Sequence, residues 1–158
     1  MTTARSTLAS VRKDLTIKTS PAHAFRTFTE LFDQWWPRSH HIGKAELKKV
    51  VLEPAQGGRW YEIGADGSEC NWGRVLVWNP PARLILAWQI NADWQYDPRL
   101  VTEVEVNFVA EGPNLTRFTL EHRNIEKFGI RAQEMWNAFD SEGGWTGILN
   151  TFAKLAES

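Results

Sequence analysis

The fold of this chain is constrained most by its central segment, residues 46–129, in which turn signals recur at short intervals. Each signal contains proline, glycine or asparagine, which either fix φ or allow it to become positive, so the chain reverses there. The signals are Pro54 with Gly57-Gly58, Asp66-Gly67, Asn79-Pro80-Pro81, Asp97-Pro98 and Gly112-Pro113-Asn114. Connections this short join neighbouring antiparallel strands, so the pattern predicts a β-meander without crossover helices.

Seven strands are predicted in total. Six lie between the turn signals, at residues 46–53, 59–63, 69–78, 84–90, 100–110 and 115–123. The seventh comes earlier, at residues 11–19, where Val11, Leu15 and Ile17 share one face and charged residues occupy the other. This alternation is typical of a strand with one buried face.

Helical patterns flank the strands. Ser20 followed by Pro21 is typical of a helix start, and apolar residues then recur at helical spacing until Pro37, which predicts a helix over residues 21–36. Near the C-terminus a short helix is predicted around Met135 and Phe139. A longer helix follows Asp140-Ser141, with one apolar face formed by Trp145, Ile148, Leu149, Phe152, Leu155 and Ala156.

This order of elements predicts an α+β helix-grip fold, a curved antiparallel sheet of about seven strands wrapped around a long C-terminal helix. A single helix cannot fill the concave face of such a sheet, so we expect a cavity between them, the default position for a ligand. Gly143-Gly144 lowers helix propensity but allows the backbone to approach a neighbour closely. We expect a flexible N-terminus at residues 1–10 and a single domain over residues 11–158.

Composition and charge exclude several classes of function. The chain has 18 basic and 19 acidic residues, so it lacks the basic surface that nucleic-acid binding requires. A single cysteine, Cys70, forms no internal disulfide, and no spacing of metal ligands occurs, so no metal or cofactor is expected. No apolar stretch approaches the roughly 20 residues that span a membrane, and a cytoplasmic protein is expected.

Sequence motifs for catalysis are also absent, and no catalytic residue is assigned. His40 and His41 are adjacent, so an extended backbone would point them to opposite sides. His122 shares strand parity with Phe118 and Leu120, so it is expected on the inner face, where it could orient a ligand or belong to a hydrogen-bonded core.

Tryptophan is unusually abundant, with nine residues in 158. Indole rings either fill cores or line pockets for flat apolar ligands, so the content fits both roles. Parity along the strands places Trp72, Arg74 and Trp78 on one face of their strand. The predicted ligand-binding residues are Trp60, Tyr61, Trp72, Arg74, Trp88, Phe118, His122 and Trp145.

Several motifs together resemble a known family. They are Trp35-Trp36, Gly57-Gly58-Arg59-Trp60, Gly73-Arg74-Val75-Leu76, Pro80-Pro81, the strand Thr116-x-Phe118-x-Leu120-x-His122, and Gly144-Trp145. Their order is similar to that in the bacterial SRPBCC superfamily (START-like, helix-grip), in the branch named for the activator of the heat-shock-protein ATPase. The resemblance covers residues 11–156 and implies the helix-grip fold and a hydrophobic ligand cavity.

Three hypotheses for function follow. The first is non-catalytic binding of a small hydrophobic or aromatic ligand between the sheet and the C-terminal helix. The second is an interaction protein, a homologue of the heat-shock ATPase activator with a chaperone or other partner in a stress response. The third is a small-molecule enzyme of the cyclase or hydrolase type that uses His122 as acid or base. A homodimer is left open.

Overall fold

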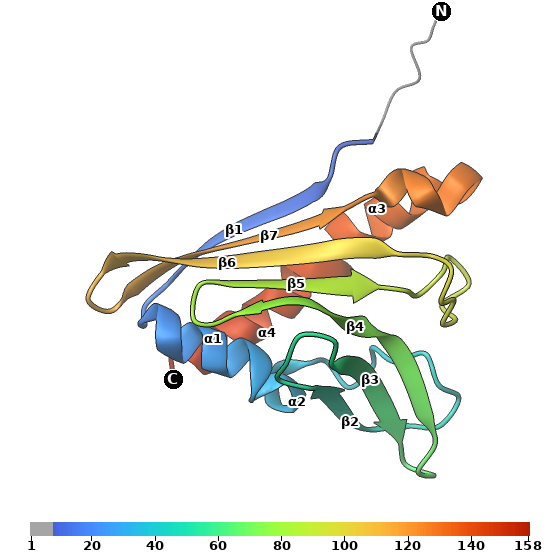
Figure 1. The fold of residues 1–158 in the computed structure, drawn as a ribbon, viewed down its shortest axis with the longest axis horizontal. Helices are drawn as coiled ribbons and strands as arrows, with labels where there is room; N and C mark the ends of the chain where they lie inside the picture. The colour runs from blue at the N-terminus through green and yellow to red at the C-terminus, as the bar shows by residue number, and fades with distance from the viewer. Residues whose placement is uncertain (1–7) are drawn as a thin grey trace, which may run out of the picture.

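The computed structural model describes residues 8–158, in which a single seven-stranded antiparallel sheet carries helices on its inner face (Figure 1). The strands are β1 Val11–Ile17, β2 Leu47–Leu52, β3 Arg59–Gly64, β4 Glu69–Asn79, β5 Arg83–Trp88, β6 Thr102–Gly112 and β7 Leu115–Arg123. Their order is β1-β7-β6-β5-β4-β3-β2. The predicted α+β helix-grip fold is therefore confirmed: β2 to β7 form a meander, and β1 pairs with β7.

The N-terminal helical segment differs from the prediction, because it forms two helices instead of one. Helix α1 spans Pro21–Thr29 and α2 spans Phe32–Trp35. Ser20 caps α1 as expected, since its Oγ accepts a hydrogen bond from the backbone N–H of His23 (3.2 Å). The break turns α2 back toward α1, so that the buried Trp35 indole N–H donates to the carbonyl of Thr27 (2.9 Å).

The C-terminal helix is bent. A 3₁₀ segment, η1 Ile125–Arg131, leads into α3 Ala132–Asp140, a π turn follows at η2 Glu142–Thr146, and α4 spans Gly147–Ala156. The bend lies at Gly144, whose backbone is not helical (φ −98°, ψ −140°). A Cβ atom at this position would collide with the carbonyl oxygens of Ala138 and Phe139, so the close backbone approach expected from the glycine pair occurs at Gly144.

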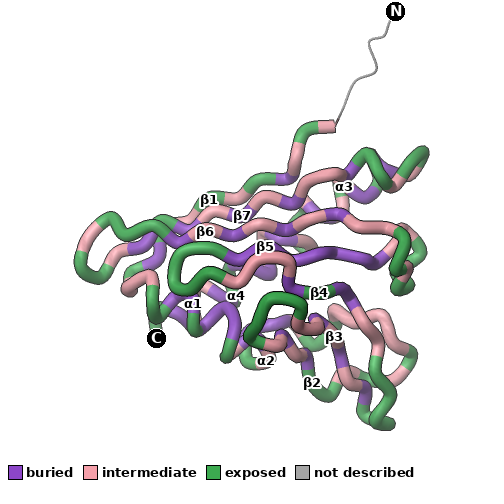
Figure 2. Tube along the Cα trace, viewed as in Figure 1, coloured by how far each residue is buried: buried purple, intermediate pink, exposed green. Residues whose placement is uncertain are grey.

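The inner face of the sheet holds an aromatic core. Phe28 on α1 contacts Phe118 on β7 (ring centroids 5.8 Å apart), and Phe152 on α4 contacts the same ring (5.1 Å). Strand β5 is buried along most of its length, as Figure 2 shows by its continuous purple trace. These contacts attach α1 and α4 to the sheet and leave the opposite end, toward β3, β4 and η2, for the site described below.

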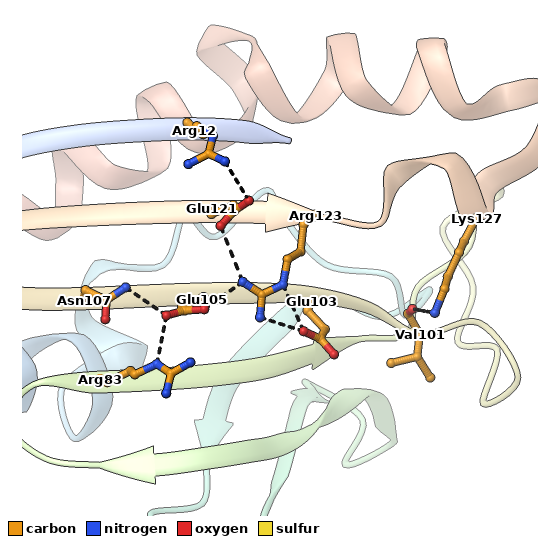
Figure 3. Close-up of polar contacts among 9 residues, drawn as sticks. All are labelled: Arg12, Arg83, Val101, Glu103, Glu105, Asn107, Glu121, Arg123 and Lys127. Atoms are coloured by element: carbon orange, nitrogen blue, oxygen red, sulfur yellow. Dashed lines mark hydrogen bonds and ion pairs between the residues drawn. The ribbon is translucent and has the colours of Figure 1, made fainter. Parts of the chain in front are cut away.

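The outer face of the sheet carries cross-strand ion pairs (Figure 3). Arg123 on β7 bridges Glu103 and Glu105 on β6 (both 2.7 Å), and Arg83 on β5 contacts Glu105 from the other side (2.8 Å). Burial acts to raise the pKa of Glu105, but hydrogen bonds from Arg83 and Arg123 outweigh it and lower that pKa to about 2. The network therefore joins β5, β6 and β7 across three strands.

The first strand is preceded by an attached segment. Leu8 packs against the core, and the carbonyl of Ala9 accepts a hydrogen bond from the Trp136 indole (2.8 Å). The flexible N-terminus expected at residues 1–10 falls mainly on residues 1–7, which lie outside the described residues.

A bulge in β4 changes the side-chain alternation that the sequence suggested. Trp60 pairs with Gly73 while Tyr61 pairs with Asn71, so Trp72 is an extra residue in the ladder. Trp72 and Gly73 are both buried, and Arg74 is exposed. The expectation that Arg74 shares a face with Trp72 is therefore wrong, because the bulge shifts the parity of the strand by one residue.

Candidate functional site

A cavity of about 370 Å³ lies between the sheet, the connection from α2 to β2 and the bent C-terminal helix. Its apolar walls come from strands, helices and loops that are distant in sequence. The lining residues are Trp36, Ser39, His40, His41, Ile42, Trp72, Trp88, Ile90, Trp94, Ala138, Phe139, Ser141, Gly143, Gly144, Trp145 and Ile148. The predicted space between sheet and helix is thus present in the structure.

Five tryptophans and Phe139 line the cavity, and their rings pack mainly edge to face or tilted. Trp36 contacts Trp72 (centroids 5.1 Å apart) and Trp145 (6.3 Å). Trp88 contacts Trp145 (6.0 Å) and Phe139 (5.3 Å). Because each ring is supported by at least one other ring, the wall is rigid and presents apolar surface to the cavity.

The loop at residues 37–46 is held against the sheet by Glu62. This carboxylate is buried on the inner face of β3, with only 1% of the residue exposed. Its Oε1 accepts hydrogen bonds from the Ile42 backbone N–H (2.7 Å) and the Trp72 indole (2.8 Å), and its Oε2 accepts one from the Gly43 N–H (3.0 Å). Three donors satisfy the buried charge and thereby fix both the loop and a wall tryptophan.

A second contact ties the same loop to the C-terminal bend. His40 Nε2 donates to the carbonyl of Gly143 (2.6 Å), and the carbonyl of His40 accepts from the Trp36 indole (2.7 Å). The neighbouring His41 donates from Nδ1 to the carbonyl of Gly43 (2.9 Å). Both adjacent histidines therefore line one cavity, which strand-like alternation did not predict because the loop is not extended.

His122 lies behind the cavity wall and is fully buried. Its Nδ1 accepts from the Trp145 indole (3.2 Å), so the neutral ring carries its proton on Nε2, which donates to Thr102 Oγ1 (2.9 Å). The ring stacks on Phe139 (4.3 Å) and lies near Trp88 (5.2 Å). Burial lowers the pKa of His122 to about 3, so the imidazole is neutral at ordinary pH.

The structure brings together three of the predicted ligand-binding residues. Trp72, Trp88 and Trp145 line the cavity. Trp60 lies one layer behind them, in contact with Trp72 (5.5 Å) and Trp88 (5.7 Å). His122 occupies the layer behind Trp88 and Trp145, as described above. These residues support the wall from the sheet side.

Three other predicted residues lie elsewhere. Phe118 packs in the deep core against Phe28 and Phe152, away from the cavity lining. Tyr61 faces the other side of β3, where the Arg59 guanidinium lies 3.8 Å from its ring centroid. Arg74 is exposed beyond the β4 bulge. The alternation of β3 itself placed Tyr61 opposite Trp60, and this signal was available in the sequence.

Sequence reasoning did not find the polar part of the site. Glu62 occupies an inward position of β3, between Trp60 and Gly64, and a charged residue on a buried face is the one signal that pointed to it. His40 and His41 line the cavity because the loop at residues 37–46 folds against it. The sequence holds no periodic pattern from which the path of this loop could be predicted. The Trp88 indole N–H, by contrast, is buried and has no acceptor among residues 8–158.

The described residues hold no group of three histidine, cysteine, aspartate or glutamate side chains that could bind a metal ion. None of the helices in residues 8–158 has the length and hydropathy needed to cross a membrane.

Comparisons with known proteins identify the family to which the chain belongs. The protein-family model described as Activator of Hsp90 ATPase homolog 1-like protein matches residues 18–157. The chain belongs to this family. In this member of the Activator of Hsp90 ATPase homolog 1-like family, the cavity lies between the seven-stranded sheet and the bent C-terminal helix. No curated protein matched the chain.

Two solved structures are similar in both sequence and fold. One is an anthrahydroquino-gamma-pyrone synthase, Txn09, complexed with SUM, at 38% identity and a TM-score of 0.66; the match covers 94% of this chain and 97% of that one. The other is CalC, a self-sacrificing resistance protein from Micromonospora echinospora, at 33% identity and a TM-score of 0.71, covering 94% of each chain. Protein MLL2253 from Mesorhizobium loti, at 18% identity, 92% and 95% coverage and a TM-score of 0.66, shares the fold.

Proposed function

We propose that this protein binds a small, planar, mostly aromatic molecule in the cavity between the sheet and the bent C-terminal helix. The observation that carries the proposal is the cavity itself, about 370 Å³ in volume, with five tryptophans and Phe139 among its lining residues. Pockets for small ligands have volumes of roughly 300–1,000 Å³ and predominantly apolar linings with a few polar groups. The ligand is therefore of two or three fused rings rather than a long lipid chain.

One similar protein supports this ligand class. The name of Txn09 describes the synthesis of a fused aromatic product, and the chain is 38% identical to it along nearly its full length. Flat apolar ligands suit indole walls, because an indole offers a broad face together with a single donor.

Ligand titration tests the proposal with a matched pair of variants. Ala138 lines the cavity from α3, whereas Ala153 on α4 has similar partial burial and lies outside it. Ala138→Phe places a ring in the cavity, so we expect the Kd for 1-naphthol or 2-hydroxyanthraquinone to rise by about tenfold or more, roughly 1.4 kcal/mol. Ala153→Phe should change it by less than about twofold. Quenching of tryptophan fluorescence and calorimetry supply the measurements.

The titration can also contradict the proposal. If naphthols and hydroxyanthraquinones leave fluorescence, heat and melting temperature of the wild-type protein unchanged, the cavity does not serve planar aromatic ligands. Equal affinity of wild-type protein and Ala138→Phe would place any binding elsewhere on the molecule.

Catalysis on the same class of ligand is a second candidate, favoured by the 38% identity with a synthase. His122 is poorly placed as its acid or base, since both ring nitrogens are hydrogen-bonded behind the wall. Mass spectrometry of the ligand after incubation separates the two candidates. Recovery of an unchanged ligand supports binding, and a time-dependent mass change that is abolished in Ala138→Phe supports an enzyme.

The family description motivates a third candidate, a chaperone partner. Its test is the ATPase rate of the cognate Hsp90 with and without this protein. A rate that rises in proportion to added protein supports the partner, and an unaltered rate leaves the cavity as the functional site.

A further inference from the structure

Of the two histidines that line the cavity, only His41 has a ring nitrogen without a hydrogen-bond partner within residues 8–158. Both ring nitrogens of His40 are engaged, with Ser39 Oγ (2.9 Å) and the Gly143 carbonyl (2.6 Å). His41 lines the cavity, and its Nε2 has no hydrogen-bond partner within residues 8–158.

The hydrogen bond at the opposite nitrogen decides the chemistry of His41 Nε2. His41 Nδ1 lies 2.9 Å from the carbonyl oxygen of Gly43, and a carbonyl oxygen can only accept. Nδ1 therefore carries the proton, and in the neutral imidazole the lone pair is on Nε2. The cavity thus presents an acceptor at this position.

The orientation of this acceptor is fixed by the buried carboxylate of Glu62. Glu62 accepts from the backbone N–H groups of Ile42 (2.7 Å) and Gly43 (3.0 Å), the two residues that follow His41. These two bonds anchor the backbone next to the Gly43 carbonyl that accepts from the imidazole. A preorganised acceptor costs a ligand little conformational entropy and gives directional selectivity.

We propose that the cavity selects planar aromatic molecules that carry a ring hydroxyl, a phenol or a naphthol, whose O–H donates to His41 Nε2. The proposal rests on the function proposed above and narrows its ligand class. The rings occupy the tryptophan-lined space, while the hydroxyl faces the loop at residues 37–46. A ligand without the hydroxyl would cover the imidazole and leave its lone pair without a donor, which lowers affinity.

A pair of ligands tests this proposal: 1-naphthol, which carries the hydroxyl, and naphthalene, which lacks it. In wild-type protein we expect 1-naphthol to bind about tenfold more tightly or better. His41→Phe keeps a planar ring but removes the acceptor, so the ratio of the two Kd values should fall to within about twofold. His41→Gln, whose Oε1 can reach the position of Nε2, should restore part of the preference.

His23→Phe is the matched control, because His23 is an exposed histidine on α1 outside the cavity. The ratio of the two Kd values in this variant should equal the ratio in the wild-type protein. If both compounds bind and the wild-type protein does not distinguish them, or if His41→Phe keeps the full preference, the assignment of His41 is overturned while aromatic binding stands. If neither compound binds, aromatic binding itself fails and the assignment with it. Where a variant does not fold, equal affinity of the wild-type protein for the two compounds still overturns the assignment.

Discussion

His122 lies at the centre of a hydrogen-bonded chain that starts at the Trp145 indole, passes through the imidazole to Thr102 and ends at the Trp88 carbonyl. His122 and Thr102 each donate and accept, the Trp145 indole uses its only donor, and the Trp88 carbonyl accepts, so these groups are satisfied. The two tryptophans in this chain also line the cavity. The histidine therefore acts on the site indirectly, by fixing the rings that a ligand would contact.

This arrangement predicts a pH dependence of stability. The folded state lowers the pKa of His122 from 6.5 to about 3, so the unfolded chain binds a proton more readily than the folded protein between these values. Stability from His122 is complete above pH 6.5 and is lost as the pH falls toward 3, by at most about 1.4 kcal/mol per pH unit.

Urea unfolding at pH 7.5, 6.5, 5.5 and 5.0 checks this expectation. The free energy of unfolding of the wild-type protein should fall over this range, and the profile of His122→Gln should be flatter. His23→Gln, at an exposed histidine, should reproduce the wild-type slope. Parallel profiles for wild-type protein and His122→Gln would show that His122 is not held neutral by the fold.

At the scale of elements, the bend between α3 and α4 shapes one side of the cavity. Gly143 and Gly144 both line the space, and the carbonyl of Gly143 receives His40. A continuous helix from residue 132 to residue 156 would not provide this carbonyl, because helical carbonyls are bonded within the helix. The bend thus joins the C-terminal helix to the loop at residues 37–46.

The two glycines offer a matched test of the bend. Gly144→Ala introduces a Cβ that collides with the carbonyl oxygens of Ala138 and Phe139, so we expect a loss of about 1–3 kcal/mol of stability and weaker ligand binding. The nearest neighbour of a Cβ at Gly143 is Ser141 Oγ, at 4.0 Å, so Gly143→Ala should cost less than about 0.5 kcal/mol. Urea unfolding and ligand titration measure both effects. Equal stability of the two variants would contradict the role given to Gly144.

The elements themselves were largely predictable, because turn residues and alternation act locally. Strand β7 matches its predicted bounds, and α1 begins at Pro21 after its Ser20 cap, as expected. The break after Thr29 and the bulge at Trp72 were not predictable in this way. Both depend on tertiary contacts, such as the hydrogen bonds from Trp35 to Thr27 and from Trp72 to Glu62.

The sheet separates aromatic packing on its inner face from ion pairs on its outer face. Its inner face carries rings and the cavity, and its outer face carries the ion pairs of Arg123, Glu103, Glu105 and Arg83 (Figure 3). The sequence predicted such a division for the first strand, where Val11, Leu15 and Ile17 share one face and charged residues occupy the other. It did not predict the polar residues of the site, because Glu62, His40 and His41 meet only through the path of a loop.

The outer network predicts a second pH effect, at lower pH than that of His122. Since the fold lowers the pKa of Glu105 from 4.5 to about 2, its contribution to stability is present above pH 4.5 and is lost as the pH falls toward 2. Urea unfolding between pH 5 and 2.5 should give a shallower profile for Glu105→Gln than for the wild-type protein. Glu111→Gln, at an exposed position of β6, should behave as wild type. A Glu105→Gln profile as steep as that of the wild-type protein would remove Glu105 from the network's pH response.

The pairing of β1 with β7 affects when the protein can fold during its synthesis. Val11 lies opposite His122, and the cavity takes its walls from residues 36 through 148, so neither the sheet nor the site is closed until almost the entire chain is present. Contacts between such distant residues close large loops and make folding slow relative to that of helical proteins of equal size. A chain cut before β7 consequently lacks both the partner strand of β1 and the helical side of the cavity.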